Sequence, residues 1–161
     1  SARTNSVEFP TGLPWLNVTE PLTMQQLKGK VVLLDFWTYG CVNCIHVIPD
    51  LHKLEQKYGN QLAVISVHSP KFDNEKQLST LTSIVRRYGM QHAVVNDVDF
   101  QLWRSYAVRA WPTFVLIGPD GKYIGQTSGE GRYEVLDQAR WLHKNHRELH
   151  SSIANQDEGR H

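Results

Sequence analysis

Residues 31–44 read VVLLDFWTYGCVNC, a short apolar run that is followed by two cysteines. The run 31–37 has the length of a β-strand, and its nearly continuous apolar character indicates burial on both faces of a sheet. The apolar positions after the cysteines follow helical spacing: Ile45, Ile48, Leu51 and Leu54. Gly59 supplies a stop for this helix. The segment therefore predicts a strand, a turn that carries Cys41 and Cys44, and a helix.

The rest of the chain alternates between apolar runs and amphipathic stretches. Strands are expected at residues 62–67, 93–95, 113–117 and 122–127, and helices at 78–88, 100–106 and 135–142. The first of these helices is expected to be opened by Asp73 or Asn74 and closed by Gly89. The last two strands flank a Gly-Pro-Asp-Gly turn at 118–121, which predicts a hairpin. This order predicts an α/β fold with a central mixed sheet flanked by helices.

Length and composition fit one compact domain, since the chain has 161 residues and 40% of them are hydrophobic. Residues 1–28 mix prolines and glycine with isolated aromatic residues, which predicts an irregular lead-in that packs on the domain. The domain itself is expected to span residues 29–149. Residues 150–161 are polar and are expected to form a tail.

The charge balance argues against two classes of partner. With 17 basic and 16 acidic side chains, the chain has no long-range field to attract nucleic acid or an acidic membrane surface. It has no run of the roughly 18 apolar residues that a membrane-spanning helix needs. We therefore expect neither a nucleic-acid nor a membrane partner, and recognition by direct contact.

The two cysteines have the spacing of a redox pair. At the start of a helix, unpaired backbone N–H groups stabilise a thiolate, so Cys41 is expected to be the attacking nucleophile. Cys44 lies one helical turn later, close enough to attack a mixed disulfide on Cys41. A disulfide that closes so small a ring contributes little to stability and suits cycling instead.

The sequence predicts no metal or cofactor. Zinc usually takes four ligands, and besides the cysteines the chain offers only histidines such as His46, His52, His143 and His146. Covalent haem attachment requires histidine directly after the second cysteine, but Ile45 stands there. An iron–sulfur cluster would need more thiolates.

These residues resemble those of the thioredoxin superfamily over most of the chain, from about Val7 to Leu149. The resemblance is carried by Phe36-Trp37, the Cys-x-x-Cys pair, Pro49, and Trp111-Pro112-Thr113. In finer detail the chain resembles the TlpA/DipZ-like branch, with an extra strand-helix insertion in the fold. It resembles most closely the thioredoxin-like domain of NHL-repeat-containing proteins. Segments carrying the finer match include Cys44-Ile45-His46, Val67-His68-Ser69-Pro70, Asn74-Glu75-Lys76 and Val95-Asn96-Asp97.

The resemblance implies a substrate-binding surface around the cysteines. It implies that Pro112 is in cis and faces them, with Trp111 presenting backbone groups to an extended substrate strand. Thr113, Trp37 and Gly40 are expected beside them. Gly40 departs from the pattern, because thioredoxins usually carry Trp immediately before the first cysteine.

Asp35 lies inside the apolar run, where a carboxylate is costly unless it has a task or a partner. The resemblance implies that it assists proton transfer at Cys44. The alternative is a structural pair with Lys30 or Lys71.

The leading hypothesis is a thiol-disulfide oxidoreductase that acts on disulfide-containing proteins and draws electrons from an external thiol reductase. One alternative is a binding module that docks a partner or an adjacent NHL propeller with little turnover. Another is a copper-handling domain that uses both thiolates with His143 or His146. A catalytic pair without structural disulfides leans toward the cytoplasm, and the periplasm or a lumen stays open.

Overall fold

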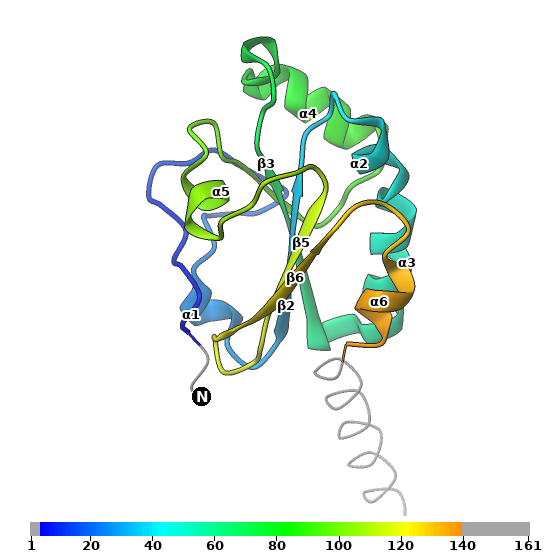
Figure 1. The fold of residues 1–161 in the computed structure, drawn as a ribbon. Helices are drawn as coiled ribbons and strands as arrows, with labels where there is room; N and C mark the ends of the chain where they lie inside the picture. Colours follow the sequence, from blue (N-terminus) through cyan, green and yellow to red (C-terminus); the bar gives the residue numbers. More distant parts are fainter. Residues whose placement is uncertain (1–3, 140–161) are drawn as a thin grey trace, which may run out of the picture.

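A computed structural model describes residues 4–139, and within them six strands form one sheet, shown in Figure 1. The strands are β1 (Trp15–Leu16), β2 (Val31–Trp37), β3 (Leu62–His68), β4 (Ala93–Asn96), β5 (Thr113–Ile117) and β6 (Tyr123–Ser128). Their order across the sheet is β1-β4-β3-β2-β5-β6. Strands β2, β3 and β4 are parallel, whereas the pairs β1–β4, β2–β5 and β5–β6 are antiparallel. The expected mixed sheet is confirmed.

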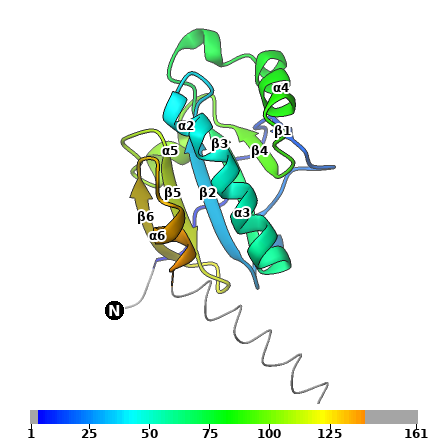
Figure 2. The same cartoon turned by 90° about the vertical axis from the view of Figure 1, so that its right-hand side faces the viewer.

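Helices cover both faces of the sheet, as Figures 1 and 2 show. They are α1 (Met24–Leu27), α2 (Val42–His46), α3 (Ile48–Tyr58), α4 (Leu78–Arg87), α5 (Gln101–Ser105) and α6 (Tyr133–Asp137). Helices α3 and α6 pack on one face, and α1 and α5 on the other. Helix α4 and strand β4 form the expected strand-helix insertion between β3 and α5. The sheet is therefore buried on both sides, which explains its apolar strands.

Strand β2 forms the centre of the core, because none of its seven side chains is more than 2% exposed. Its alternate residues serve opposite faces: Leu33 packs with α3, whereas Leu34 and Phe36 pack with α5. Full burial of a leucine stabilises the fold by about 1.5–3 kcal/mol. This rigid strand ends four residues before Cys41.

The helix after the cysteines is interrupted at Val47, which separates α2 from α3. The expected helix was continuous. Pro49 falls in the first turn of α3, where its missing N–H costs nothing, but it cannot continue the hydrogen bonding of α2. Gly59 caps the end with φ 52°, so the expected stop is confirmed.

The expected start of α4 is wrong. Asp73 and Asn74 belong to a separate 3₁₀ turn, Asp73–Glu75, and α4 begins at Leu78 with Gln77 as its N-cap. The reason is tertiary: Glu75 is buried against Thr38, and the Asn96 amide donates a hydrogen bond to the Lys76 carbonyl. These contacts hold Asp73–Glu75 in a separate turn, so α4 does not extend back to Asp73.

The N-terminal segment adds an edge strand, because β1 pairs with β4. It also contributes Phe9, Met24 and Leu27 to the buried core on the α5 side of the sheet. The domain limits at 28/29 and 149/150 stay predictions. Leu142, His143, His146 and the expected tail lie outside the described residues. Within residues 4–139, no helix has both the length and the apolarity to cross a membrane.

Candidate active site

The two cysteines lie where β2 gives way to α2. Cys41 is the N-cap of α2, and its sulfur accepts a hydrogen bond from the Cys44 backbone N–H at 3.4 Å. The Cys41 backbone N–H is itself bound to the Thr38 carbonyl. Cys41 is partly exposed, whereas Cys44 is only 1% exposed. One sulfur therefore meets solvent, and the other lies beneath it.

The two thiols differ chemically. Burial raises the pKa of the Cys44 thiol far above its ordinary value, and the neighbouring Cys41 sulfur and Asp35 carboxylate raise it further. A thiol does not attack a disulfide until it loses its proton. Cys44 therefore needs a base at close range before it can react.

Trp111 and Pro112 approach Cys41 from the loop before β5. The Trp111–Pro112 peptide bond is cis, as the resemblance implied, and the Trp111 carbonyl oxygen lies 4.0 Å from the Cys41 sulfur. The indole nitrogen of Trp111 donates a hydrogen bond to the Ser69 carbonyl at 2.8 Å. Its ring packs against Trp103, with centroids 4.4 Å apart. The hydrogen bond to Ser69 and the packing against Trp103 thus fix Trp111 beside Cys41.

The other expected substrate-binding residues differ in exposure. Gly40 is exposed beside Cys41. Trp37 and Thr113 are buried, at 1% and 0% exposed. The Thr113 hydroxyl donates to the Ala110 carbonyl and contacts Ser128, which fixes the loop. Trp37 packs in the same cluster as Cys44.

Asp35 is buried behind Cys44 in β2. Its carboxyl accepts a hydrogen bond from Ser66 at 3.0 Å. Burial raises the pKa of Asp35 to about 6, against a lowering by the nearby His92 and by Ser66. Lys71, one of the two expected pairing lysines, instead lies over the Phe72 and Trp111 rings. A carboxyl that titrates near neutral pH can take and give protons there.

A polar cluster under the cysteine loop went unrecognised in the sequence. The Thr38 hydroxyl donates to Glu75, which is 3% exposed, and the fully buried His68 contacts Asn96 at 2.9 Å. Burial lowers the pKa of His68 to about 4, so it is neutral at physiological pH. Most of these residues lie in segments that carry the family resemblance, but no spacing rule assigns them a place. A methyl group on Gly40 would overlap the Glu75 carboxylate.

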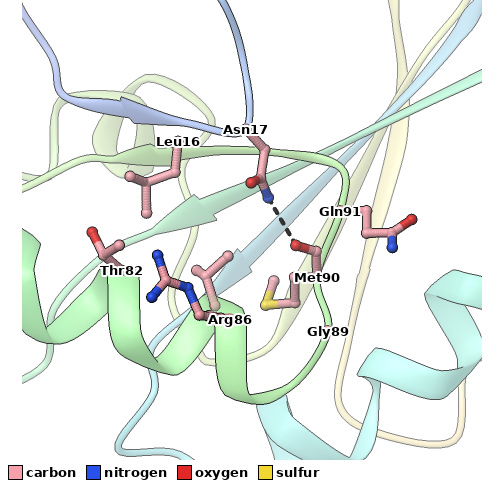
Figure 3. A pocket seen from close by; sticks show the side chains of 8 residues that line it. Leu16, Asn17, Thr82, Arg86, Gly89, Met90 and Gln91 are labelled. Atoms are coloured by element: carbon pink, nitrogen blue, oxygen red, sulfur yellow. Dashed lines mark hydrogen bonds between the residues drawn. The ribbon is translucent and has the colours of Figure 1, made fainter.

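A hollow between β1 and α4 lies elsewhere on the molecule and contains no residue of the cysteine or Trp111 loops (Figure 3). Leu16, Thr82, Arg86 and Met90 line it. At its edge the Asn17 amide donates hydrogen bonds to the carbonyls of Met90 and His92, at 2.8 and 3.0 Å. Asn17 therefore ties the N-terminal segment to the loop that precedes β4.

Within residues 4–139, no group of three or more His, Cys, Asp or Glu side chains is arranged to hold a metal ion. The copper hypothesis also invokes His143 or His146, which lie outside these residues. His46 is the ion-pair partner of Glu130 at 3.0 Å.

Comparisons with known proteins agree with this geometry. A family model described as thioredoxin-like matches residues 29–123. "Protein SUPPRESSOR OF QUENCHING 1, chloroplastic" of Arabidopsis thaliana is 53% identical over 132 residues, and "NHL repeat-containing protein 2" of Homo sapiens is 49% identical over 132. These alignments cover 81% and 80% of this chain but only 12% and 18% of the relatives, so the chain spans a small part of their length. The expected resemblance to NHL-repeat proteins is confirmed.

Shorter proteins and a solved structure match as well. "Thiol-disulfide oxidoreductase ResA" of Halalkalibacterium halodurans is 32% identical over 120 residues, covering 74% of this chain and 65% of that protein. A solution structure of an oxidised thioredoxin-like protein superposes with a TM-score of 0.78 at 23% identity, over 88% of this chain and 97% of that one. The second match shows the fold alone.

Proposed function

We infer that this chain, which belongs to the thioredoxin-like family, is a thiol-disulfide oxidoreductase that exchanges electrons with protein disulfides through Cys41 and Cys44. The observation that carries the proposal is the difference in exposure between two cysteines that lie one helical turn apart. Cys41 is partly exposed and its sulfur accepts a backbone hydrogen bond, whereas Cys44 is buried one turn later. This arrangement suits an attacking thiolate and a resolving thiol.

The reaction proceeds in two exchanges. The Cys41 thiolate attacks a substrate disulfide, forms a mixed disulfide and releases one substrate thiolate. Cys44 then loses its proton and attacks the Cys41 sulfur, which releases the second substrate thiolate and leaves a Cys41–Cys44 disulfide. Two electrons pass from the cysteine pair to the substrate. An external thiol reductase restores the pair.

Asp35 is the base for the second exchange. Its charge acts on Cys44 and its pKa of about 6 lets it be ionised at neutral pH and still bind a proton. The substrate lies along the cis-proline loop, where the Trp111 carbonyl, 4.0 Å from the Cys41 sulfur, can pair with an extended segment. The exposed side chain of Val42 borders the same place.

The wider context of the domain follows from its relatives. NHL repeat-containing protein 2 is named for its NHL repeats, and the alignment covers 18% of it. We therefore place this domain beside an NHL propeller in a larger protein, with disulfide-containing proteins as substrates.

Trapping of the mixed disulfide tests the proposal. Cys44→Ser removes the resolving thiol, so it is expected to accumulate covalent complexes with disulfide-containing proteins that dithiothreitol releases. Cys41→Ser and the double variant are expected to trap none, because the attacking sulfur is gone. Non-reducing and reducing gels of captured complexes measure the difference.

The same gels distinguish this function from that of a binding module. A binding module would retain its partner equally in all three variants and without a reducible link. Equal trapping by Cys41→Ser would show that the attacking and resolving roles are assigned to the wrong cysteines.

A further inference from the structure

The base of the proposed reaction is itself enclosed. Asp35 is 2% exposed and Cys44 1%, so a proton taken from the thiol cannot pass directly from the carboxyl to bulk water. One carboxyl oxygen, Oδ1, is buried and has no hydrogen-bond partner among the described residues. The other oxygen, Oδ2, accepts the Ser66 hydroxyl. One carboxyl oxygen is thus free to bind a proton, and the other is hydrogen-bonded to Ser66.

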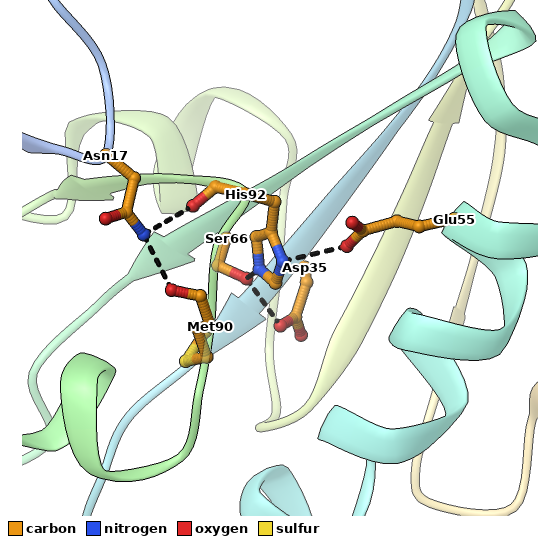
Figure 4. Close-up of polar contacts among 6 residues, drawn as sticks. All are labelled: Asn17, Asp35, Glu55, Ser66, Met90 and His92. Atoms are coloured by element: carbon orange, nitrogen blue, oxygen red, sulfur yellow. Dashed lines mark hydrogen bonds and ion pairs between the residues drawn. The ribbon is translucent and has the colours of Figure 1, made fainter.

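A line of polar side chains leads away from that second oxygen (Figure 4). The Ser66 oxygen lies 3.0 Å from Asp35 Oδ2 and 2.6 Å from Nε2 of His92. On the far side of the imidazole, Nδ1 lies 2.9 Å from Oε1 of Glu55. That last contact has the distance of an ion pair but does not have the angles of a hydrogen bond. The Glu55 side chain is 30% exposed, so the line reaches solvent.

Four separate elements hold these groups in place. Strand pairing sets Ser66 of β3 directly beside Asp35 of β2. The two Asn17 hydrogen bonds to the Met90 and His92 carbonyls fix the loop that carries the imidazole. Helix α3 brings Glu55 over the sheet. An arrangement that depends on three long-range contacts is not a consequence of local sequence.

The protons on this line can be assigned. A hydroxyl has one hydrogen, so when Ser66 donates to Asp35 it must accept from His92, whose Nε2 then carries a proton. Nδ1 lies 2.9 Å from the Glu55 carboxylate. An imidazole has two ring nitrogens, so it can accept a proton on one of them and release a proton from the other.

We propose that Ser66, His92 and Glu55 form a proton relay between Asp35 and solvent, and that this relay clears the proton of Cys44 during disulfide exchange. The inference rests on the proposed function and deepens it. These three residues do not touch the reacting sulfurs, so they act through Asp35 as positioning residues.

The steps balance as proton transfers with no change in electron count. The Cys44 S–H bond breaks and an O–H bond forms on Asp35. When His92 is neutral with Nε2 free, Asp35 gives its proton to Ser66, and Ser66 gives its own to Nε2. The imidazolium formed in this step then loses the proton of its Nδ1 to water at the Glu55 end. The reverse sequence supplies protons when the pair is reduced.

The pH dependence follows from the groups that face Asp35. They are Cys44 from α2, Ser66 from β3, and His92 with Glu55 beyond it. Because His92 lowers the pKa of Asp35 through its charge interaction, His92→Gln is expected to raise that pKa. The pH at which resolution reaches half of its full rate is expected to rise with it.

Stopped-flow reaction of the reduced chain with 5,5′-dithiobis(2-nitrobenzoate) separates the two steps. Attack by Cys41 releases the first thionitrobenzoate, and resolution by Cys44 releases the second. Ser66→Ala, His92→Gln and Glu55→Gln are expected to slow the second release about tenfold and leave the first unchanged. His92→Gln keeps an N–H donor for Ser66 but cannot pass a proton. His52→Gln and Asp50→Asn, both on α3, are the matched controls and are expected to match wild type.

Carbon-13 NMR titration of the Asp35 carboxyl gives a second readout. His92→Gln is expected to move its midpoint upward from about 6, which a merely structural variant does not do. Unchanged second-phase rates and an unchanged midpoint in His92→Gln and Ser66→Ala would overturn the relay alone. A Cys44→Ser chain that traps no disulfide-containing protein would instead overturn the proposed function.

Discussion

The burial of Asp35 makes the stability of the fold depend on pH, and the same burial gives this residue a pKa suited to the proposed proton transfer. It stands in a strand whose other side chains are apolar, and burial disfavours its charged form. Its usual pKa is 3.8 and the folded chain raises it to about 6. The folded state therefore holds the proton more tightly than the unfolded state, so the contribution of this group to stability is fully present below pH 3.8. It falls as the pH rises toward 6 and stays low above that.

Asp35→Asn is expected to remove this pH dependence. The difference of about two pKa units corresponds to about 3 kcal/mol. Asparagine stays neutral and still accepts from Ser66, so the variant is expected to be more stable than wild type at pH 8 and similar to it at pH 3.5. Urea unfolding of the reduced chain at both pH values measures this. A wild-type stability advantage at pH 8 would contradict it. The same variant is expected to resolve mixed disulfides more slowly.

Gly40→Ala tests the contact between the cysteine loop and Glu75. The added methyl group would overlap the Glu75 carboxylate, which is held by Thr38. Such overpacking is expected to lower the free energy of unfolding by about 1–3 kcal/mol. Gly125→Ala in β6 is the control, because its methyl group meets no atom within 4 Å. Equal urea midpoints for the two variants would show that the carboxylate moves aside freely.

At the level of elements, the site is the meeting point of two loops. One loop leaves β2 and begins α2 at Cys41, and the other enters β5 through the cis Trp111–Pro112 bond. Because β2 and β5 are antiparallel neighbours, the end of one strand lies beside the start of the other. Thr113 and Phe36 are directly paired there. The sheet therefore brings Cys41 and Trp111 together although 70 positions separate them.

Tryptophan fluorescence is expected to report this contact. A disulfide near an indole alters its emission, and the Trp111 carbonyl lies 4.0 Å from the Cys41 sulfur. Reduction is expected to change the emission of wild type markedly and that of Trp111→Phe less, with a residual change from Trp37, which packs with Cys44. Trp15→Phe, on β1, is the control and is expected to keep the full change. An identical response in Trp111→Phe and wild type would place Trp111 away from the redox pair.

At the scale of the whole molecule, the N-terminal segment packs on one face of the sheet and pairs with one of its edges. It supplies β1 at the edge of the sheet and three buried side chains of the core, Phe9, Met24 and Leu27. Through Asn17 it also holds the loop that carries His92. An exposed β4 edge would otherwise present unpaired backbone groups.

Deletion of residues 1–28 is expected to unfold the chain. Three buried apolar side chains contribute about 5–9 kcal/mol together, which is comparable to the whole stability of a domain. Circular dichroism and thermal unfolding measure the loss, and Glu20→Ala, an exposed change in the same segment, is expected to leave the transition unchanged. A cooperative transition in the deleted chain, at the temperature of the full one, would show that residues 29 onward are self-sufficient.

The sequence by itself determined the features that depend on neighbouring residues. The strand at 31–37, the hairpin before the last helix, the stop at Gly59 and the cysteine pair follow from apolar runs, turn residues and short spacings. Recognition of the family added the cis bond at Pro112. Each of these patterns spans about ten neighbouring residues, so it can be recognised without the tertiary structure.

Only the tertiary structure decided which polar groups meet. The Asp35–Ser66 pair depends on the register of β2 against β3, and His92 joins it from a loop 26 positions beyond Ser66. Burial of Glu75 displaced the start of α4 for the same reason. A buried polar group must satisfy its hydrogen bonds wherever the packed chain supplies a partner, and that choice is made in three dimensions.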